Sequence, residues 1–114
     1  MEAIENIYRK REYEVVVRFP EFTCLCPMTG QPDFAEILIT YTPDASLVEL
    51  KSLKLYLNSY RDRGIFHEEA VNTILDDFVE TIHPRKVEVV GTFNVRGGIH
   101  TTVRAQYPAP SQEQ

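Results

Sequence analysis

The sequence predicts an α+β fold in which two helices lie on one face of a four-stranded antiparallel sheet. Two segments with the alternating pattern of strands come first, two segments with the spacing of helices follow, and two further alternating segments come last. The predicted order of elements is therefore ββααββ. Each pair of strands is expected to form a hairpin, which makes the sheet antiparallel.

The first two strands are predicted over residues 12–19 and 34–41. In the first, apolar and charged side chains alternate: Tyr13, Val15, Val17 and Phe19 alternate with Glu14 and Arg18. Pro20 is expected to end this strand. The second strand is rich in Ile, Thr and Tyr, and it is expected to stop at Pro43 and Asp44. A wide loop rich in Pro and Gly connects the two.

Both helices are predicted from their start signals and their apolar spacing. Ser46-x-x-Glu49 has the pattern of a capping box, so the first helix is expected to begin there and to continue until Gly64. The second helix is expected to begin at about His67 and to stop at Pro84. Apolar residues recur at helical spacing in both segments: Leu53, Tyr56, Leu57 and Tyr60 in the first, and Ala70, Ile74, Phe78 and Ile82 in the second.

The last two strands are predicted to form a hairpin around the turn Arg96-Gly97-Gly98. Before the turn, Val87, Val89 and Gly91 alternate with charged residues, and alternation resumes over residues 99–106. These two strands complete the predicted sheet.

The chain is predicted to form one domain over residues 12–107. Residues 1–11 form a polar N-terminal segment, and residues 108–114 are expected to be a disordered tail because they contain no apolar anchor. A length of 114 residues allows only a modest core, so the ligand is expected to be small.

Composition and charge limit the classes of partner. A formal charge of −5 without a continuous basic patch argues against binding to nucleic acid or to a membrane surface. No apolar run approaches the roughly 20 residues of a membrane span, and the first residues are charged rather than signal-like. A cytoplasmic protein is therefore expected.

Cys24 and Cys26 are one residue apart, which favours reduced thiols because a disulfide would close almost no loop.

The predicted sheet leaves its edge strands open. Open edges are normally covered or paired, and pairing between identical subunits would close them into a ring with pockets between the chains. The sequence therefore predicts a homo-oligomer with active sites between subunits.

The loop between the first two strands carries the candidate chemistry. Cys26 and Asp33 lie at its two ends, in a segment of Pro and Gly that is unsuited to helix or sheet interior. Together they offer a nucleophile and a proton donor for a small electrophile. Each also has a simpler explanation, since Cys26 could fill the core and Asp33 could cap a turn. Cys24 is expected to face the core and is given no role.

Five segments together resemble a known family: Phe22-Thr23-Cys24-Leu25-Cys26-Pro27, Gly30-Gln31-Pro32-Asp33-Phe34, Glu49-Leu50-Lys51-Ser52-Leu53-Lys54-Leu55-Tyr56, Phe66-His67-Glu68 and Arg96-Gly97-Gly98. In this order and spacing the chain resembles the QueF family of NADPH-dependent 7-cyano-7-deazaguanine reductases, the nitrile reductases of queuosine biosynthesis, a tRNA modification pathway. The resemblance extends over about residues 12–106 and indicates the short, single-module type. It implies the tunnelling fold (T-fold), whose rings bind purines or pterins between subunits, and it suggests a decamer of two pentameric rings.

The resemblance implies a reaction without a metal. Cys26 would add to the nitrile carbon of the substrate to form a covalent thioimide, and Asp33 would donate a proton to the nitrile nitrogen. Asp33 would then have to be protonated at that step and partly desolvated. Two hydrides from NADPH would complete the reduction to 7-aminomethyl-7-deazaguanine.

The resemblance also assigns the binding residues. Substrate would be bound by Val48, Glu49, Leu50, His67 and Glu68, and NADPH by Lys51, Lys54, Arg96 and Gly97. Glu68 can accept two hydrogen bonds from a guanine-like edge, and His67 would help to orient it. Leu50 stands where other members often have Ser, so a hydroxyl contact is lost there or replaced by backbone. The two lysines are i, i+3 on one helix, where they could equally be a solvated face, and the sequence has no Gly-x-Gly-x-x-Gly fingerprint.

Two alternatives stay open at this point. A zinc-dependent cyclohydrolase of the same fold would use Cys and His ligands, but no His lies at metal-ligand spacing from the two cysteines. A non-catalytic purine- or pterin-binding protein could keep Glu68 but would not need Cys26, Asp33 and both lysines together.

Overall fold

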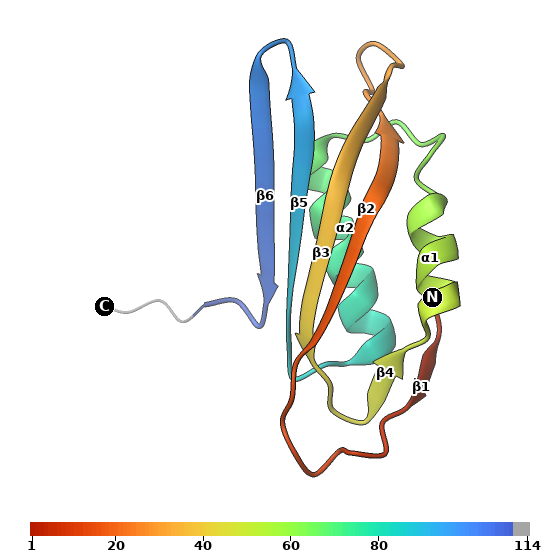
Figure 1. Ribbon diagram of the computed structural model, residues 1–114, viewed down its shortest axis with the longest axis vertical. Helices are drawn as coiled ribbons and strands as arrows, with labels where there is room; N and C mark the ends of the chain where they lie inside the picture. Colours follow the sequence, from red (N-terminus) through yellow and green to blue (C-terminus); the bar gives the residue numbers. More distant parts are fainter. Residues whose placement is uncertain (111–114) are drawn as a thin grey trace.

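The computed structural model describes residues 1–110 (Figure 1). The elements in chain order are β1 (Ala3–Glu5), β2 (Val15–Leu25), β3 (Pro32–Thr42), β4 (Ser46–Val48), α1 (Leu50–Asn58), α2 (His67–Ile82), β5 (Lys86–Arg96) and β6 (Ile99–Tyr107). The main sheet has the order β2-β3-β5-β6 with every pair antiparallel, and both helices lie on one face of it (Figure 1). The predicted α+β architecture is confirmed.

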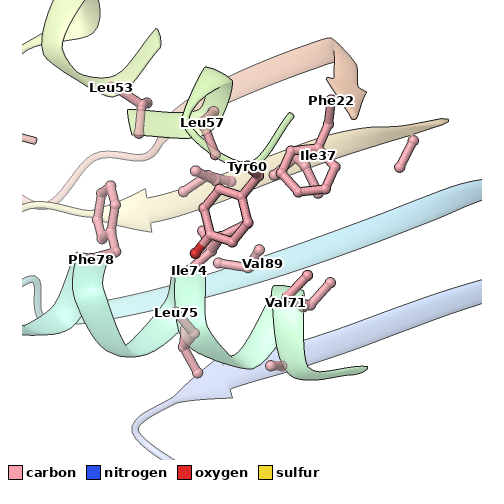
Figure 2. Packing of buried hydrophobic residues seen from close by; sticks show 14 of the residues in the cluster. Phe22, Ile37, Leu53, Leu57, Tyr60, Val71, Ile74, Leu75, Phe78 and Val89 are labelled. Carbon is pink, nitrogen blue, oxygen red and sulfur yellow. The ribbon is translucent and has the colours of Figure 1, made fainter. Parts of the chain in front are cut away.

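The core lies between this face of the sheet and the two helices (Figure 2). The sheet and both helices contribute side chains that are almost completely buried: Phe22, Ile37 and Val89 from the sheet, Ile74 and Phe78 from α2, and Leu53 and Leu57 from α1. Burial of each such side chain stabilises the fold by about 1.5–3 kcal/mol. The apolar spacing predicted for the helices therefore identifies the faces that pack on the sheet.

Gly91 lets helix α2 approach strand β5 closely. A Cβ atom at this position would lie 2.6 Å from Cγ2 of Val71 and 3.0 Å from Cε1 of Phe93. Both neighbours are buried, so neither side chain can move aside into solvent. The glycine therefore sets the distance between the sheet and the N-terminal half of α2, the helix that carries His67.

The start of the first helix differs from the prediction. Ser46 is not a helix cap, because it lies in β4, which pairs with β1 in a separate two-stranded sheet. The helix begins at Leu50, and Glu49 is its N-cap: the carboxylate accepts hydrogen bonds from the backbone N–H groups of Lys51 (2.9 Å) and Ser52 (2.8 Å). The polar segment 1–11 contributes β1 to this arrangement.

Strand β2 extends beyond its predicted end. It passes Pro20 through an irregularity in pairing between Phe19 and Phe22 and continues to Leu25. Proline is tolerated here because β2 is an edge strand and its bulge needs no N–H donor. Strand β3 also begins earlier than predicted, at Pro32. Asp33 is therefore a strand residue rather than a loop residue.

The C-terminal hairpin follows the prediction closely. Gly97 and Gly98 have φ angles of 58° and 83°, as a two-residue turn with two left-handed positions requires. Residues 108–110 follow β6 outside any strand or helix. The part of the predicted disordered tail at residues 111–114 lies outside the described residues. Among residues 1–110, no helix is long and apolar enough to cross a membrane.

Candidate active site

A tight loop, residues 26–31, connects β2 to β3 and places Cys26 at the end of β2. Two backbone hydrogen bonds close it: the N–H of Cys26 donates to the carbonyl of Gln31, and the N–H of Gly30 donates to the carbonyl of Cys26, each at 2.8 Å. Gly30 adopts a φ of 73°, which glycine accepts without strain. The thiol therefore lies on a short loop that is closed by its own backbone hydrogen bonds.

The loop also makes Cys26 more acidic. Hydrogen bonds from the Thr29 hydroxyl, and from the backbone N–H groups of Thr29 and Met28, lower the pKa of the Cys26 thiol from 9.0, against smaller opposing effects of desolvation and of the nearby Asp33. Cys24 has the opposite environment, since it is fully buried and burial raises its pKa to about 11. Because the thiolate is the nucleophilic form, the environment of Cys26 favours reactivity and that of Cys24 disfavours it. Cys24 is a core residue, as predicted.

Asp33 lies in β3 directly opposite Cys24, with only 8% of its surface exposed. Its two carboxylate oxygens have different partners. Oδ1 accepts a hydrogen bond from Nη1 of Arg96, and Oδ2 lies 3.2 Å from Nε2 of His67. The sequence predicted desolvation of this carboxyl, and the structure confirms that it is buried.

His67 is the first residue of α2, and a second contact fixes its ring. The imidazole stacks on Phe93 with 3.8 Å between ring centroids and 7° between planes. Phe93 is itself buried in β5, so the imidazole has a rigid support that keeps Nε2 facing Asp33. His67 is thus held by contacts to two strands of the sheet.

Arg96, at the end of β5, closes the other side of Asp33. Besides its ion pair with Asp33, its Nη2 donates to Oε1 of Gln31 at 2.9 Å. The guanidinium therefore joins the β5–β6 hairpin to the Cys26 loop. The sequence analysis assigned Arg96 to the cofactor and did not foresee its contact with Asp33, because no local pattern connects residues 63 positions apart.

Cys26, Asp33, His67, Glu68 and Arg96 all line one cavity of about 270 Å³. This volume suits one small planar molecule. Sequence reasoning missed further lining residues from α2's start and from the β5–β6 hairpin: Phe66, Asn94, Ile99 and Thr101. Asn94, Ile99 and Thr101 flank the Arg96-Gly97 turn. The turn motif could therefore have indicated that this hairpin forms a wall of the cavity.

The remaining predicted residues do not reach this cavity. Val48, Glu49 and Leu50 line a different hollow of about 410 Å³ beside β1 and β4, at the start of α1 and away from the β2–β3 loop (Figure 1). Glu49 is engaged as the helix cap, and the two N–H groups that it accepts lower its pKa. Leu50 is 62% exposed. One chain therefore brings together the predicted reacting groups but not this part of the predicted substrate site.

The predicted cofactor residues are also divided. Lys51 and Lys54 are exposed on α1, whereas Arg96 and Gly97 belong to the β5–β6 hairpin. Lys54 lines a groove between α1 and β2, and Gly97 has open space around it. Within residues 1–110, the groove beside Lys54 does not include Arg96, and the Cys26 cavity, which includes Arg96, contains neither lysine.

Residues 1–110 contain no cluster of three or more His, Cys, Asp or Glu side chains arranged to hold a metal ion. Both cysteines are free thiols. The described residues thus offer no centre of the type that a zinc cyclohydrolase needs.

The fold and site define a small α+β protein that carries an acidified thiol beside a buried carboxyl group. The family described as QueF-like protein matches the chain over residues 32–112, and the chain belongs to this family. The resemblance seen in the sequence is confirmed.

Relatives cover nearly the whole chain. A protein of Thermomicrobium roseum is 58% identical over 107 residues, which are 94% of this chain and 84% of the relative. One from Anaeromyxobacter dehalogenans is 60% identical over 94% of this chain and 88% of its own length, and one from Nitrosococcus oceani is 54% identical over 96% and 85%. All three are named NADPH-dependent 7-cyano-7-deazaguanine reductase.

The fold recurs in a solved structure. The apo form of the archaeosine synthase QueF-Like superimposes with a TM-score of 0.76 over 88% of this chain and 96% of that one. The sequence identity is 23%, so this similarity bears on the fold alone.

Proposed function

We propose that this chain is an NADPH-dependent reductase that converts the nitrile of 7-cyano-7-deazaguanine into the primary amine 7-aminomethyl-7-deazaguanine, a step of queuosine biosynthesis. The observation that carries the proposal is the pairing of an acidified thiol, Cys26, with a buried carboxyl, Asp33, in one small cavity. The identity of 58–60% to proteins named for this reaction supports the choice of substrate and cofactor.

Cys26 is the nucleophile in this proposal. A nitrile accepts hydride poorly, and addition of the Cys26 thiolate to its carbon creates a thioimide that accepts it more readily. The lowered pKa raises the fraction of thiolate near neutral pH, which favours the addition. The thiolate leaves again when the carbon has accepted the first hydride, so the enzyme is regenerated in each turnover.

Asp33 supplies protons to the nitrogen. Conversion of a nitrile into an amine puts two hydrides on carbon and two protons on nitrogen, so a single acid must be recharged once in each turnover. His67 is placed to do this, because its Nε2 lies 3.2 Å from Oδ2 of Asp33 and its side chain is 22% exposed. The contact of Arg96 with the other oxygen keeps the carboxyl in position.

Glu68 reads the base. It lies in the first turn of α2, is exposed, and borders the same cavity as Cys26. No residue from 1 to 110 forms a salt bridge with it, so its carboxylate is available for the ring N–H and the exocyclic amine of a guanine-like edge.

The active enzyme is a homo-oligomer in the cytoplasm, with sites shared between subunits. Val48, Glu49 and Leu50 reach the substrate only if a second copy presents its own α1 start to the Cys26 cavity. The edge strands β2 and β6 have open sides and expose apolar residues, with Val16 59% and Ile99 70% exposed. Pairing of these edges buries that surface and would build the decamer of two pentameric rings.

NADPH supplies hydride to the carbon when it is bound. The residues that would hold it are Lys51, Lys54, Arg96 and Gly97, and the cationic side chains among them suit phosphate groups. Because these residues lie on α1 and on the β5–β6 hairpin, the cofactor would have to extend between these two elements.

Stoichiometry tests the proposed function. Purified protein is mixed with 7-cyano-7-deazaguanine and NADPH, cofactor oxidation is followed by absorbance, and loss of nitrile is measured chromatographically. The expected result is two NADPH oxidised for each nitrile lost, with no consumption by the Cys26→Ala variant. Absence of NADPH oxidation by a folded oligomer with reduced thiols would overturn the proposal and favour a binding protein.

A further inference from the structure

A groove of about 480 Å³ lies between edge strand β2 and helix α1, separate from the Cys26 cavity. The bulged part of β2, Phe19–Thr23, forms one wall. Lys54 and Asn58 of α1 form the other wall, and Arg61 comes from the connection after α1. Of the residues assigned above, Lys54 alone lines this groove.

The groove contains cations without partners. Five arginines contact carboxylates (Arg9, Arg18, Arg85, Arg96 and Arg104), and Arg11 and Arg63 lie over tyrosine rings. Within residues 1–110, Arg61 makes neither kind of contact, and Lys54 forms no salt bridge. On a chain of formal charge −5, two unpaired cations in one groove offer a local site for an anion.

The chemistry of the groove fits a phosphate monoester attached to a nucleoside. Such a phosphate carries a charge of about −1.5 to −2 at neutral pH, so it matches two cations. A guanidinium can hold two of its oxygens in a bidentate contact while an ammonium adds a point charge. The ring of Phe34, which is 52% exposed, borders the same groove and provides an apolar face for a base.

We propose that this groove binds the adenosine 2′-phosphate end of NADPH and that Arg61 determines the preference for NADPH over NADH. The inference rests on the proposed function and adds to it a specificity-determining residue. The 2′-phosphate is the monoester of this cofactor and the group that NADH lacks, so the residue that binds it discriminates between the two.

The groove is connected to the thiol along one strand. Thr23 lines the groove, and Cys26 is three residues further along the chain at the end of β2. At about 3.3 Å per residue this separation is roughly 10 Å. An extended dinucleotide is longer than that, so its nicotinamide can approach the Cys26 loop while its adenosine end stays in the groove.

Glu21 provides a test of opposite sign. Its carboxylate also borders the groove and has no salt-bridge partner within residues 1–110. A carboxylate repels a bound phosphate, so its removal should strengthen binding, whereas removal of the Arg61 charge should weaken it. If only the net charge of the protein mattered, removal of any surface cation would weaken phosphate binding as much as removal of the Arg61 charge does. A cation far from the groove therefore serves as the control.

The experiment measures KM for NADPH and the inhibition constant of adenosine 2′,5′-bisphosphate in the wild-type enzyme and in three variants. Arg61→Gln is expected to raise both constants roughly tenfold to a hundredfold, the range expected for loss of charged hydrogen bonds. Inhibition by 5′-AMP, which lacks the 2′-phosphate, should change less than twofold. Glu21→Gln should lower both constants, and the control Lys10→Gln, in the β1–β2 connection, should leave them unchanged.

Two outcomes would overturn the inference. One is an Arg61→Gln enzyme with unchanged constants, and the other is an equal rise for 5′-AMP and for the bisphosphate. Failure of the proposed function is a separate result, namely no NADPH oxidation by the wild-type protein. In that event, calorimetric titration of the wild type and Arg61→Gln with adenosine 2′,5′-bisphosphate still tests the groove directly.

Discussion

The Cys26 cavity and the region at the start of α1 are organised differently. Where β2 ends and β3 begins, side chains from separate elements touch. Asp33 contacts both His67 and Arg96, and Arg96 also bonds to Gln31. At the start of α1, the three predicted binding residues form no such contacts with one another: Val48 is buried in the core. Leu50 is 62% exposed there, and the Glu49 carboxylate is used as the helix cap.

This difference divides the predicted substrate-binding residues. His67 and Glu68 line the Cys26 cavity, whereas Val48, Glu49 and Leu50 line a different hollow. The reacting groups are held in place within one chain by contacts that are already formed, which limits the reorganisation needed for chemistry. The predicted recognition groups at the start of α1 have no access to the thiol in the same chain. In the proposed mechanism, a single copy therefore holds the reacting groups together but does not bring Val48, Glu49 and Leu50 to them.

Removal of the thiol should have the largest effect. Cys26→Ala eliminates the nucleophile, so incubation with the nitrile in the absence of NADPH should give no covalent adduct, and turnover should fall to background. The intact mass of the protein after incubation measures the adduct. Cys24→Ala is the matched control, since Cys24 is buried and its pKa is raised to about 11, so this variant should keep the adduct. An adduct on Cys26→Ala would transfer the nucleophilic role elsewhere.

Loss of the proton donor should be next in size. Asp33→Asn keeps the shape of the side chain but cannot supply the proton, so the rate of NADPH oxidation should fall by about 10²–10⁴. Asp44→Asn serves as control, because Asp44 also contacts arginines but lies outside the Cys26 cavity. A near-normal rate for a folded Asp33→Asn enzyme would remove Asp33 from the reaction.

The fold could be predicted from periodicity where the signal is local. The order ββααββ and the faces of both helices follow from the spacing of apolar residues, and the Gly97-Gly98 turn follows from its two glycines. The short strands β1 and β4 were not foreseen, since three residues show no period and each strand exists only through the other. Ser46 had the local pattern of a cap, but pairing with β1 placed it in a strand.

The site shows the same limit. The closeness of Cys26 and Asp33 follows from one short loop, and so does the acidifying effect of Thr29. The contacts of Asp33 join residues 34 and 63 positions away, which come together only through the sheet order and the packing of α2. The division of the binding residues between separate cavities also depends on the fold, and no motif indicates it.

Loss of the base-recognising carboxylate should have a smaller effect on activity than loss of the thiol or of the proton donor. Glu68→Ala removes the acceptor for the guanine-like edge, so KM for the nitrile should rise roughly tenfold to a hundredfold while kcat changes less. Glu69→Ala is a closely matched control, because Glu69 is also exposed in the first turn of α2 but does not line the Cys26 cavity. Equal effects of the two substitutions would indicate a change in the helix rather than a contact with substrate.

Mixed oligomers test directly whether the Cys26 cavity of one subunit meets the start of α1 of another. Cys26→Ala and Glu49→Gln variants, each inactive or impaired alone, are unfolded together and reassembled in equal amounts. If each site takes its thiol from one copy and its α1 start from a neighbour, random assembly should restore about a quarter of wild-type activity. If both ends of one chain serve the same site, every chain is defective and mixing restores nothing.

The smallest effect concerns the acidity of the thiol. The Thr29 hydroxyl is the largest contributor to the lowered pKa of Cys26, so Thr29→Ala should move that pKa back toward 9.0. Thiolate forms as the pH rises through this pKa, so alkylation of Cys26 by iodoacetamide should reach its half-maximal rate at higher pH in the variant and should slow a few-fold at neutral pH. Cys24 should stay unreactive in both proteins because burial raises its pKa to about 11. An unchanged midpoint would assign the acidity to the backbone N–H groups of the loop, which the substitution leaves in place.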